Sequence, residues 1–425
     1  MNLTGWLEFI EHQHPQSIAL GLERVREVLA RLALPPLPPA ITVGGTNGKG
    51  STCAMLEAIL GAAGYRAGCY TSPHLLRYNE RVRIGGREAG DAALCDAFAA
   101  VEGARGANPL TYFEFGTLAA LWLFAREPLD ALVLEVGLGG RLDAVNAVDA
   151  GCAVITAIDI DHVDYLGGTR EAIGREKAGI FRAGRAAVVA DPLPPQAILD
   201  QARLVGADLL QIGAQFGYTT PGGGQWSYWG PGGNRHGLAY PALRGAVQLA
   251  NASAAITAID ALRARLPVAA QDIRRGLAEA SPPGRFQILP GRPAVILDVA
   301  HNPQAARVLA ANLSASGFAR RVHAVLGMLR DKDAAGVAGA LADQVTDWHL
   351  ATLHGARGRS AAELASVVKQ VAGAAKIEVH ATAAQAFAAA RRAAAENDKI
   401  IVFGSFLTVA EVLVHLGRAK PPSHA

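Results

Sequence analysis

Residues 41–52 constrain the fold of this chain more than any other segment. An apolar run, Ile41–Val43, leads into a glycine-rich turn that holds one lysine, Lys49, and a helix-forming stretch follows at Cys53–Leu60. An apolar strand that passes through glycines directly into a helix is typical of a sheet built from strand–loop–helix units. The segment therefore predicts an α/β fold.

The same turn has the chemistry to bind phosphate. Glycines let backbone N–H groups turn towards phosphate oxygens, the helix that follows points its positive N-terminal end there, and Lys49 adds a charge. The segment departs from the usual Walker A form, because Gly50 separates Lys49 from Ser51 and Thr52. A glycine-rich turn without a ligand is the alternative. A lysine between two glycines favours ATP binding.

The composition fits a protein with more than one α/β domain. A chain of 425 residues is too long for one compact core, and 51% apolar with 18% charged residues is typical of well-buried domains. The formal net charge of +3, without a basic tract, argues against a nucleic-acid partner. The longest apolar run, residues 118–124, is too short to span a membrane.

Cysteine usage and the first residues bear on the cellular location. The four cysteines are widely spaced and form no CxxC pair: Cys53, Cys69, Cys95 and Cys152. A disulfide or zinc framework is therefore not expected. Residues 1–6 lack the basic and then apolar pattern of a signal peptide, so we expect a cytoplasmic protein.

The strand candidates predict a mostly parallel sheet. They are short, continuously apolar and rich in β-branched residues, as strands buried on both faces should be. In the N-terminal part they are Ile41–Val43, Ala131–Val136, Ala153–Ile158 and Ala186–Ala190. Helical patterns, among them Leu20–Leu34 and residues 246–265, imply crossover connections. We expect a P-loop NTPase-like domain, doubly wound around this sheet.

Proline and glycine mark a domain boundary at residues 281–293. Further strand candidates then alternate with alanine-rich helices: Val295–Val299, Val322–Leu326 and Ile400–Phe403. We expect a nucleotide-binding domain at residues 1–284, a linker at 285–292, and a smaller Rossmann-like α/β domain at 293–425. Gly, Pro, Trp and Tyr dominate residues 217–237, which predicts a loop or a small antiparallel flap.

Two strand candidates end in polar residues that could hold Mg²⁺. Glu135 closes one buried strand, and Asp161, His162 and Asp164 follow the next. In doubly wound sheets, ligands bind beyond the carboxyl ends of the strands, and Mg²⁺ prefers oxygen ligands. The structural alternatives are that Glu135 pairs with an arginine and that His162 is a packed core residue.

Three further segments carry weaker signals. Residues 71–75 (TSPHL) offer hydroxyls that could equally be turn caps, and residues 175–181 would ordinarily form a solvated helix face. In the second domain, Asp298 and His301 lie at a strand-to-helix turn and could face a ligand. A capping role for Asp298 or Asn302 is the alternative.

The order of these motifs resembles the dihydrofolate synthase/folylpolyglutamate synthase family of the Mur ligase superfamily. The resemblance runs nearly end to end, so it is more specific than any single loop. It rests on these segments: Leu20–Val25, Gly45–Ser51, Thr71–Arg83, Leu134–Asp143, Asp161–Gly167, Gly174–Phe181, Asn251-Ala252, Pro283–Arg285 and Asp298–Pro303.

The resemblance implies an ATP-dependent amide ligase. In this family ATP phosphorylates a carboxylate to an acyl phosphate, which the amino group of L-glutamate attacks. The expected substrates are dihydropteroate and tetrahydrofolate, so that the chain would make dihydrofolate and also extend polyglutamate tails. By resemblance the protein is a monomer.

The resemblance also assigns residues to the phosphates and the metal. The phosphate-binding loop comprises Thr46, Asn47, Gly48, Lys49, Gly50 and Ser51. Ser72, Glu135 and His162 match the Mg²⁺ ligands, and Lys177 matches a lysine that is carboxylated in the family. A carbamate suits that place, since an ammonium would repel Mg²⁺. Lys49 and Lys177 are thus expected to be catalytic.

Other family positions hold ATP from across the cleft between the two domains, or hold the pterin. Asn251, Arg285 and Asp298 match the ATP contacts, with His301 a further catalytic candidate beside them. The pterin-binding residues are expected in three segments: Ile18, Ala19, Leu20, Gly21; Thr111, Tyr112, Phe113, Glu114; and Leu142, Asp143, Ala144. One position departs from the family, because Val247 stands where a histidine is common.

Other functions remain open at this point. The chain could be a folylpolyglutamate synthase only. A peptidoglycan Mur ligase generally has a UDP-binding domain before the loop, whereas 44 residues precede Gly45 here. A P-loop ATPase that acts as a conformational switch would not need the cluster at Asp298–Pro303.

Overall fold

The computed structural model describes residues 1–16, 18–222, 224–245, 247–373 and 375–418. The chain divides into two compact units. Unit 1 comprises Met1–His74, Tyr78–Ala242 and Gln248–Ala280, and unit 2 comprises Leu75–Arg77, Leu243–Val247 and the chain from Ser281 onward. Both are α/β units built on largely parallel sheets, which confirms the predicted fold class.

The main sheet of unit 1 has the strand order β4-β3-β2-β5-β1-β6-β7-β8. The strands from β2 to β8 run parallel to their neighbours in this order, and the antiparallel β3 and β4 complete one edge. The bounds are β1 Ala40–Gly44, β2 Ala67–Tyr70, β3 Val82–Ile84, β4 Arg87–Glu88, β5 Ala131–Glu135, β6 Cys152–Ile155, β7 Ala186–Val189 and β8 Asp208–Gln211. Strands β1, β2, β5 and β6 are buried throughout, which explains their unbroken apolar sequences.

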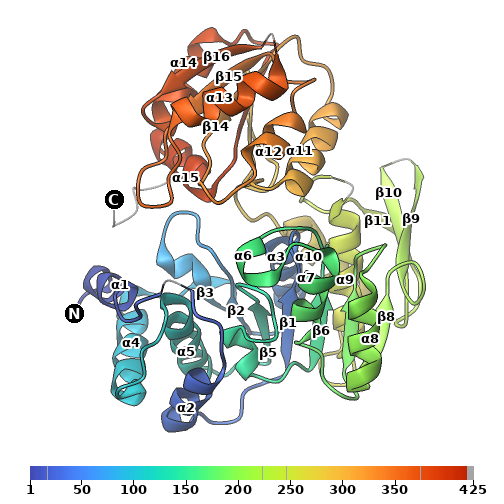
Figure 1. The fold of residues 1–425 in the computed structure, drawn as a ribbon. Coiled ribbons are helices and arrows are strands. Elements are labelled where there is room, and N and C mark those ends of the chain that lie inside the picture. Colours follow the sequence, from blue (N-terminus) through green and yellow to red (C-terminus); the bar gives the residue numbers. More distant parts are fainter. Residues whose placement is uncertain (17, 223, 246, 374, 419–425) are drawn as a thin grey trace. The chain divides into compact units, whose positions relative to one another are not determined.

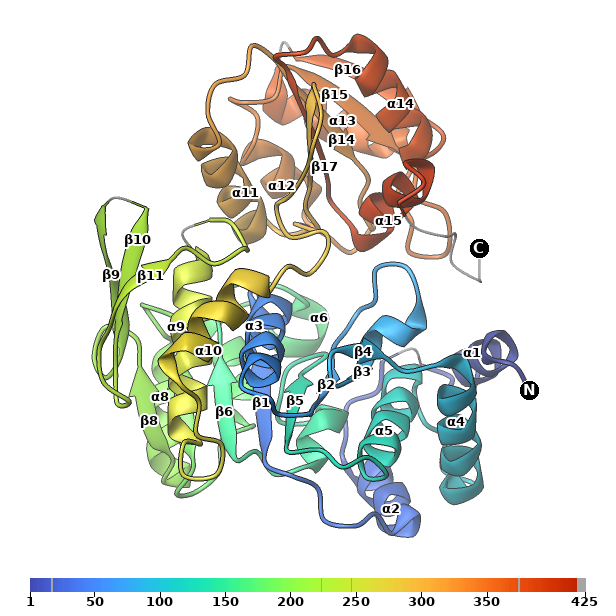
Figure 2. The ribbon, with the colours of Figure 1, turned by 180° about the vertical axis from the view of Figure 1, so that it is seen from behind.

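Helices cover both faces of this sheet. Figure 1 shows α5 and α7 in front of it, and Figure 2, from behind, shows α3 and α10 on the other face. One apolar cluster joins α1, α2, α4 and α5 to β1, β2 and β5, and another joins α7 and α8 to β6 and β7. The bounds are α1 Leu3–Glu11, α2 Glu23–Leu32, α3 Lys49–Ala62, α4 Asp91–Arg105, α5 Tyr112–Phe124, α6 Val163–Leu166, α7 Arg170–Ala178, α8 Gln196–Val205, α9 Val247–Ala261 and α10 Ala270–Glu279, with short 3₁₀ helices at Tyr78–Arg81 and Ala144–Ala147.

The glycine-rich segment after β8 forms a separate antiparallel sheet. Its order is β11-β10-β9, with β9 Gly217–Gly222, β10 Gln225–Trp229 and β11 Arg235–Ala239. Trp226 and Tyr228 on the central strand are fully buried, and the Tyr228 hydroxyl lies 3.0 Å from Thr257 Oγ1 of α9. This agrees with the predicted flap.

Unit 2 is a six-stranded sheet of order β12-β13-β17-β14-β15-β16, in which only β12 is antiparallel to its neighbour. Its strands are β12 Gln287–Leu289, β13 Ala294–Leu297, β14 Val322–Leu326, β15 Asp347–Ala351, β16 Lys376–His380 and β17 Lys399–Phe403. Its helices are α11 Pro303–Ala315, α12 Ala334–Gly339, α13 Ala361–Ala372, α14 Ala383–Ala393 and α15 Phe406–His415. Separate apolar clusters on the two faces show that helices cover both.

Several boundaries differ from the sequence prediction. The helix predicted at Leu20–Leu34 is α2, which begins at Glu23 and ends at Leu32. Strand β6 ends at Ile155, and the next residue, Thr156, donates a hydrogen bond to Asn47 O in the loop after β1. The helix predicted at 246–265 covers Val247–Ala261, and residue 246 lies outside the described residues. The four cysteines are free thiols. Among the described helices, none combines the length and apolar character needed to cross a bilayer.

Candidate nucleotide and metal site

Four neighbouring strands of unit 1 bring the predicted phosphate and metal residues to one edge of the sheet. The strands β2, β5, β1 and β6 lie side by side and run parallel. Ser72 follows β2, Glu135 ends β5, the loop 45–48 follows β1, and His162 lies beyond the end of β6. Because carboxyl ends of parallel strands share one edge, residues as distant in the chain as Gly45 and His162 come to the same edge of the sheet.

The loop between β1 and α3 depends on two glycines. Gly45 and Gly48 have φ angles of +146° and +94°, values that favour glycine. A Cβ at Gly45 would overlap the Thr156 hydroxyl, and one at Gly48 would lie 2.7 Å from Asn251 Oδ1. Thr156 Oγ1 donates to Asn47 O (2.7 Å), and Thr46 N donates to Ala157 O (2.8 Å). The loop is therefore fixed by the segment that follows β6.

Two lysine side chains converge on the start of this loop. Lys49 Nζ, in the first turn of α3, donates to the carbonyl oxygens of Gly45 (3.0 Å) and Thr46 (3.2 Å). Lys177 Nζ, from α7, donates to the same Gly45 oxygen at 2.9 Å. Gly50 and Ser51 continue the first turn of α3, where Ser51 is buried. Two lysine amines beside one carbonyl oxygen form an arrangement that suits an anion.

Burial changes the protonation of Lys177. Its side chain is 5% exposed, and burial, together with the positive charge of Lys49, lowers the pKa of Lys177 to about 7. The carboxylates of Asp161 and Asp143 act in the opposite direction. Near neutral pH a substantial fraction of Lys177 is therefore an uncharged amine.

The predicted metal ligands offer a carboxylate, a hydroxyl and an imidazole. Glu135 is 3% exposed, and its Oε2 accepts a hydrogen bond from Ser72 N at 3.2 Å, so these two residues are adjacent. His162 precedes α6 with φ +53°, in the left-handed region, and its N–H donates to Asp161 Oδ1 (2.8 Å). A buried carboxylate beside a hydroxyl residue at a strand end fits a divalent cation.

Asn251 approaches the predicted phosphate loop from a different element. It lies on α9, 6% exposed, and its Nδ2 donates to Gln248 Oε1 (2.9 Å), which leaves Oδ1 directed towards Gly48. Val247, where the family often has histidine, begins this helix and is 40% exposed. The departure at Val247 therefore does not disturb the packing of Asn251.

One of the predicted pterin residues, Asp143, is a second buried carboxyl group. Asp143 is 4% exposed and accepts hydrogen bonds from Leu138 N (2.8 Å) and Val145 N (3.0 Å). Burial raises the pKa of Asp143 to about 7, although these backbone donors oppose the shift. Leu142 and Ala144 flank it in the chain. Asp143 is thus poised to be protonated or ionised near neutral pH.

Arg24 links the other two predicted pterin segments. Its Nε donates to Glu114 Oε2 (3.0 Å), and its Nη2 donates to the carbonyl oxygen of Ala19. Glu114 and Thr111 also form the capping box of α5, in which Thr111 N donates to Glu114 Oε2 at 2.8 Å. Residues 18–21 and 111–114 are therefore brought together, while Thr111 and Glu114 have clear structural roles. Tyr112 and Phe113 open α5, and Phe113 packs on Gly137.

In unit 2, the candidates Asp298 and His301 lie on the turn after β13. Asp298 accepts hydrogen bonds from Phe286 N and Ala300 N, both 2.8 Å, and desolvation raises its pKa while the positive charge of Arg285 opposes this. His301 Nδ1 donates to Val299 O (2.9 Å), and its ring lies 6.3 Å from that of Phe406. The Arg285 guanidinium lies 5.6 Å from the same Phe406 ring.

Sequence reasoning did not single out Thr156 or Arg24. Thr156 bonds to a residue 109 positions away and Arg24 to one 90 positions away. For Thr156, a hydroxyl at the end of an apolar strand was the only available signal. Arg24 lies within a motif that was noticed, but its partner could not be deduced from spacing.

Two family descriptions match the two parts of the chain. Residues 43–259 match the Mur ligase middle domain, and residues 284–406 match the glutamate ligase domain of Mur ligases. Curated relatives match over nearly the whole length. The chain is 48% identical to the dihydrofolate synthase/folylpolyglutamate synthase of Escherichia coli K12, over 97% of this chain and 94% of the relative. It is 41% identical to that of Haemophilus influenzae, over 96% of each chain.

Solved structures agree with these matches. Escherichia coli FolC in complex with DHPP and ADP has a TM-score of 0.93 and 46% identity, with 99% of each chain covered. A Yersinia pestis bifunctional folylpolyglutamate synthase/dihydrofolate synthase complexed with AMPPNP and Mn ion has a TM-score of 0.90 and 47% identity, with 98% of each covered. This chain therefore belongs to the dihydrofolate synthase/folylpolyglutamate synthase family of Mur ligases.

Proposed function

We propose that this protein is an ATP-dependent ligase that joins L-glutamate to dihydropteroate, giving dihydrofolate, and adds further glutamates to tetrahydrofolate. The observation that carries the proposal is the convergence of Lys49 and Lys177 on the Gly45 carbonyl, with Glu135 at the end of the adjacent strand. Residues 1–284 would then bind ATP, and residues 293–425 would serve as the glutamate ligase domain.

The chemistry requires activation of the carboxylate. An amine does not displace hydroxide from a carboxylate at neutral pH, so the carboxylate oxygen first attacks the γ-phosphorus of ATP and ADP leaves. The glutamate amino group then attacks the carbonyl carbon of the acyl phosphate. The C–O bond to phosphate breaks, and the nitrogen loses a proton. Each step moves negative charge, so positioning and charge stabilisation are the main demands on the protein.

The chain supplies positive groups where that charge develops. The N–H groups of the loop 45–48 and the first turn of α3 would contact the phosphates, and Lys49 would exchange its carbonyl partners for phosphate oxygens. Ser72, Glu135 and His162 would hold Mg²⁺, which when bound neutralises phosphate charge. Asn251 of unit 1, and Arg285, Asp298 and His301 of unit 2, are proposed to bind ATP or assist the reaction.

Lys177 is proposed to carry a carbamate. The neutral amine attacks CO₂, a new N–C bond forms, and one proton is lost to solvent, which leaves a negatively charged group. The lowered pKa of Lys177 makes that amine available near pH 7. The resulting negative charge would lie beside Lys49 and could orient the metal.

For the pterin, Asp143 is the proposed contact. A buried carboxyl group at the end of a loop can pair with the donor and acceptor edge of a heterocycle. Its two backbone hydrogen bonds fix its orientation. Leu142, Ala144 and the segments 18–21 and 111–114 are proposed to line the same site. The cytoplasmic location and the monomeric state stay predictions.

Product analysis tests this function. Purified protein is incubated with dihydropteroate, ATP, Mg²⁺ and L-glutamate, and the products are identified by mass spectrometry. We expect dihydrofolate, and longer polyglutamates when tetrahydrofolate replaces dihydropteroate. Lys49→Ala should lose about 1,000-fold in rate, since it removes a charge that contacts the transferred phosphoryl group. The exposed Lys369→Ala is the matched control and should keep full activity.

Two outcomes would contradict parts of the proposal. If tetrahydrofolate is extended while no dihydrofolate forms, the protein is a folylpolyglutamate synthase only. If ATP hydrolysis runs freely and neither pteroate nor glutamate changes it, the ligase assignment is wrong.

A further inference from the structure

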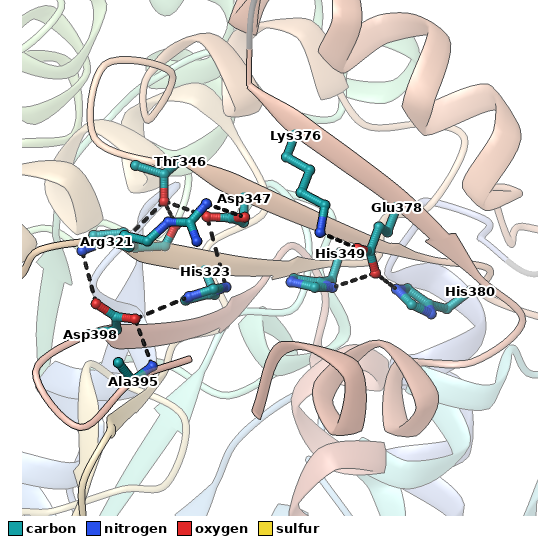
Figure 3. A network of polar contacts seen from close by, with 11 residues as sticks. Arg321, His323, Thr346, Asp347, His349, Lys376, Glu378, His380, Ala395 and Asp398 are labelled. Carbon is teal, nitrogen blue, oxygen red and sulfur yellow. Dashed lines mark hydrogen bonds and ion pairs between the residues drawn. The ribbon is translucent and has the colours of Figure 1, made fainter. Parts of the chain in front are cut away.

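One face of the unit 2 sheet carries a row of polar side chains within its strands. His323 on β14 is in register with Asp347 on β15, and His349 on β15 is in register with Glu378 on β16. His380 lies two residues after Glu378, so it shares the same face. Figure 3 shows the row, with His349, Glu378 and His380 at one end of it. None of these side chains belongs to the ligase site proposed above.

Three of these side chains direct donor atoms to one point. Glu378 Oε2 lies 3.6 Å from His349 Nδ1 and 3.9 Å from His380 Nε2. One potential ligand atom from each residue lies within 4.8 Å of the other two. Ligands of a tetrahedral Zn²⁺, each at about 2.0–2.1 Å from the metal, are about 3.3 Å apart. Small rotations of these side chains would therefore reach metal-binding distances.

The histidine nitrogens have no competing partners among the described residues. Neither ring nitrogen of His349 makes a hydrogen bond, nor does Nε2 of His380, although these atoms are shielded from solvent. His349 itself is 2% exposed. Buried polar atoms normally have a hydrogen-bond partner, so nitrogens left without one indicate a missing ligand.

The carboxylate of Glu378 is oriented from its other side. Lys376 Nζ is 2.7 Å from Glu378 Oε1, which leaves Oε2 facing the two imidazoles. A hydrogen bond to the ligand atom that does not face the metal is a common way to fix the orientation of a metal-binding side chain. The positive charges of Lys376 and of Arg392 on α14 disfavour a bound cation. Binding of a metal would therefore depend on the two imidazoles and the single carboxylate.

We propose that His349, Glu378 and His380 form a binding site for one divalent transition-metal ion of the Zn²⁺ type. Two imidazoles and one carboxylate favour Zn²⁺ over Mg²⁺ or Ca²⁺, which prefer oxygen ligands. The Glu378 side chain is 38% exposed, so water can occupy a fourth position. Because β16 is the edge strand, the ion would join it to β15 by bonds additional to the sheet ladder.

Metal titration of the full chain tests this site. Chelator-treated protein is equilibrated with Zn²⁺ in the presence of excess Mg²⁺, and bound zinc is measured by mass spectrometry after dialysis. The variants are His380→Ala and Glu378→Gln, both at partly exposed positions of the edge strand where folding should survive. His354→Ala, which removes an exposed histidine of the same unit, is the matched control.

We expect the wild type and His354→Ala to bind one more equivalent of Zn²⁺ than either variant, and the variants to bind it at least about 100-fold more weakly. Co²⁺ should give a visible absorption band with the wild type that both variants lack, which reports on the ligands directly. Retained ligase activity will show that the variants are folded. Equal zinc binding by all four proteins, or none by the wild type, would overturn the proposal.

Discussion

The two large sheets bury polar side chains at different places along their strands. In unit 1, Glu135 and Thr156 lie at or just beyond the carboxyl ends of β5 and β6. In unit 2, His323, Asp347 and His349 lie within β14 and β15 and are as deeply buried. A side chain at a strand end can contact loops and a ligand. One inside a strand is surrounded by side chains of the same face and by the helices that cover it, although His323 also reaches Asp398, which directly precedes β17, at 3.6 Å.

The largest expected effect concerns the buried lysine at the strand-end site. Lys177→Ala should lower the rate of dihydrofolate synthesis about 100-fold, because it removes the proposed carbamate beside Lys49. Small carboxylic acids added in solution should restore part of the rate by supplying a negative group in the space left. The measurement is the initial rate with and without such acids. Unchanged activity in the variant would remove the carbamate role and leave Lys177 as a support for Gly45.

A second test uses the pH dependence of stability caused by Asp143. Its pKa rises from 3.8 in the unfolded chain to about 7 when folded, so the folded state binds more protons between these values. Stability contributed by this group is complete below pH 3.8 and is lost as the pH rises through 7. Between pH 5 and pH 8 the wild type should lose about 3 kcal/mol relative to Asp143→Asn. Urea unfolding at both pH values measures this, and a pH-independent difference would contradict it.

A smaller effect is expected where one hydroxyl holds the phosphate loop. Thr156→Val removes the hydrogen bonds to Asn47 O and Gly44 O and should weaken ATP binding about tenfold, since the loop is less well ordered. Thr42→Val is the matched control: Thr42 is 1% exposed on the adjacent β1, and its hydroxyl has no hydrogen-bond partner among the described residues. Calorimetric titration with an ATP analogue should separate the two variants. Equal affinities would show that Thr156 does not order the loop.

The smallest effect concerns the row inside the unit 2 strands. Asp347 Oδ1 accepts from Arg321 Nη2 at 3.0 Å, and Oδ2 accepts from Thr346 Oγ1 at 2.6 Å. Asp347→Asn should lower the free energy of unfolding by about 1 kcal/mol, because the Arg321 partner is half exposed, and should leave kcat/KM unchanged. Asp343→Asn, at an exposed position nearby, should change neither. A loss of activity in Asp347→Asn would mean that this row affects the ligase site.

The sequence predicted strands well where they are buried and continuously apolar. Ile41–Val43 and Val322–Leu326 fall within β1 and β14. It did not predict β15 and β16, whose sequences DWHLA and KIEVH alternate polar and apolar residues. Alternation normally indicates a strand with one solvated face. In β15 the polar face is buried instead: Asp347 pairs with Arg321, which directly precedes β14, and His349 lies 3.6 Å from Glu378 on β16.

The candidate site also has residues that the sequence predicted and residues that it did not. The glycines and Lys49 could be recognised because a phosphate loop is a local structure, in which neighbouring residues perform one task. Lys177 had no signal from spacing alone and was identified by resemblance. Thr156 and Arg24 could not be found either way, since their roles depend on partners that are distant in the chain.

By itself, the sequence determined the fold class, because short-range patterns of apolar residues and glycine encode it, and the order of its motifs indicated the family and predicted the position of a phosphate loop. Only the tertiary structure decided which buried groups meet: Lys177 with the Gly45 carbonyl, Arg24 with Glu114, and His349 with Glu378. These pairings depend on strand order and register, which are properties of the whole chain. Burial then lowers the pKa values of Lys177 and His349, because desolvation disfavours charge only after the surrounding residues have excluded water.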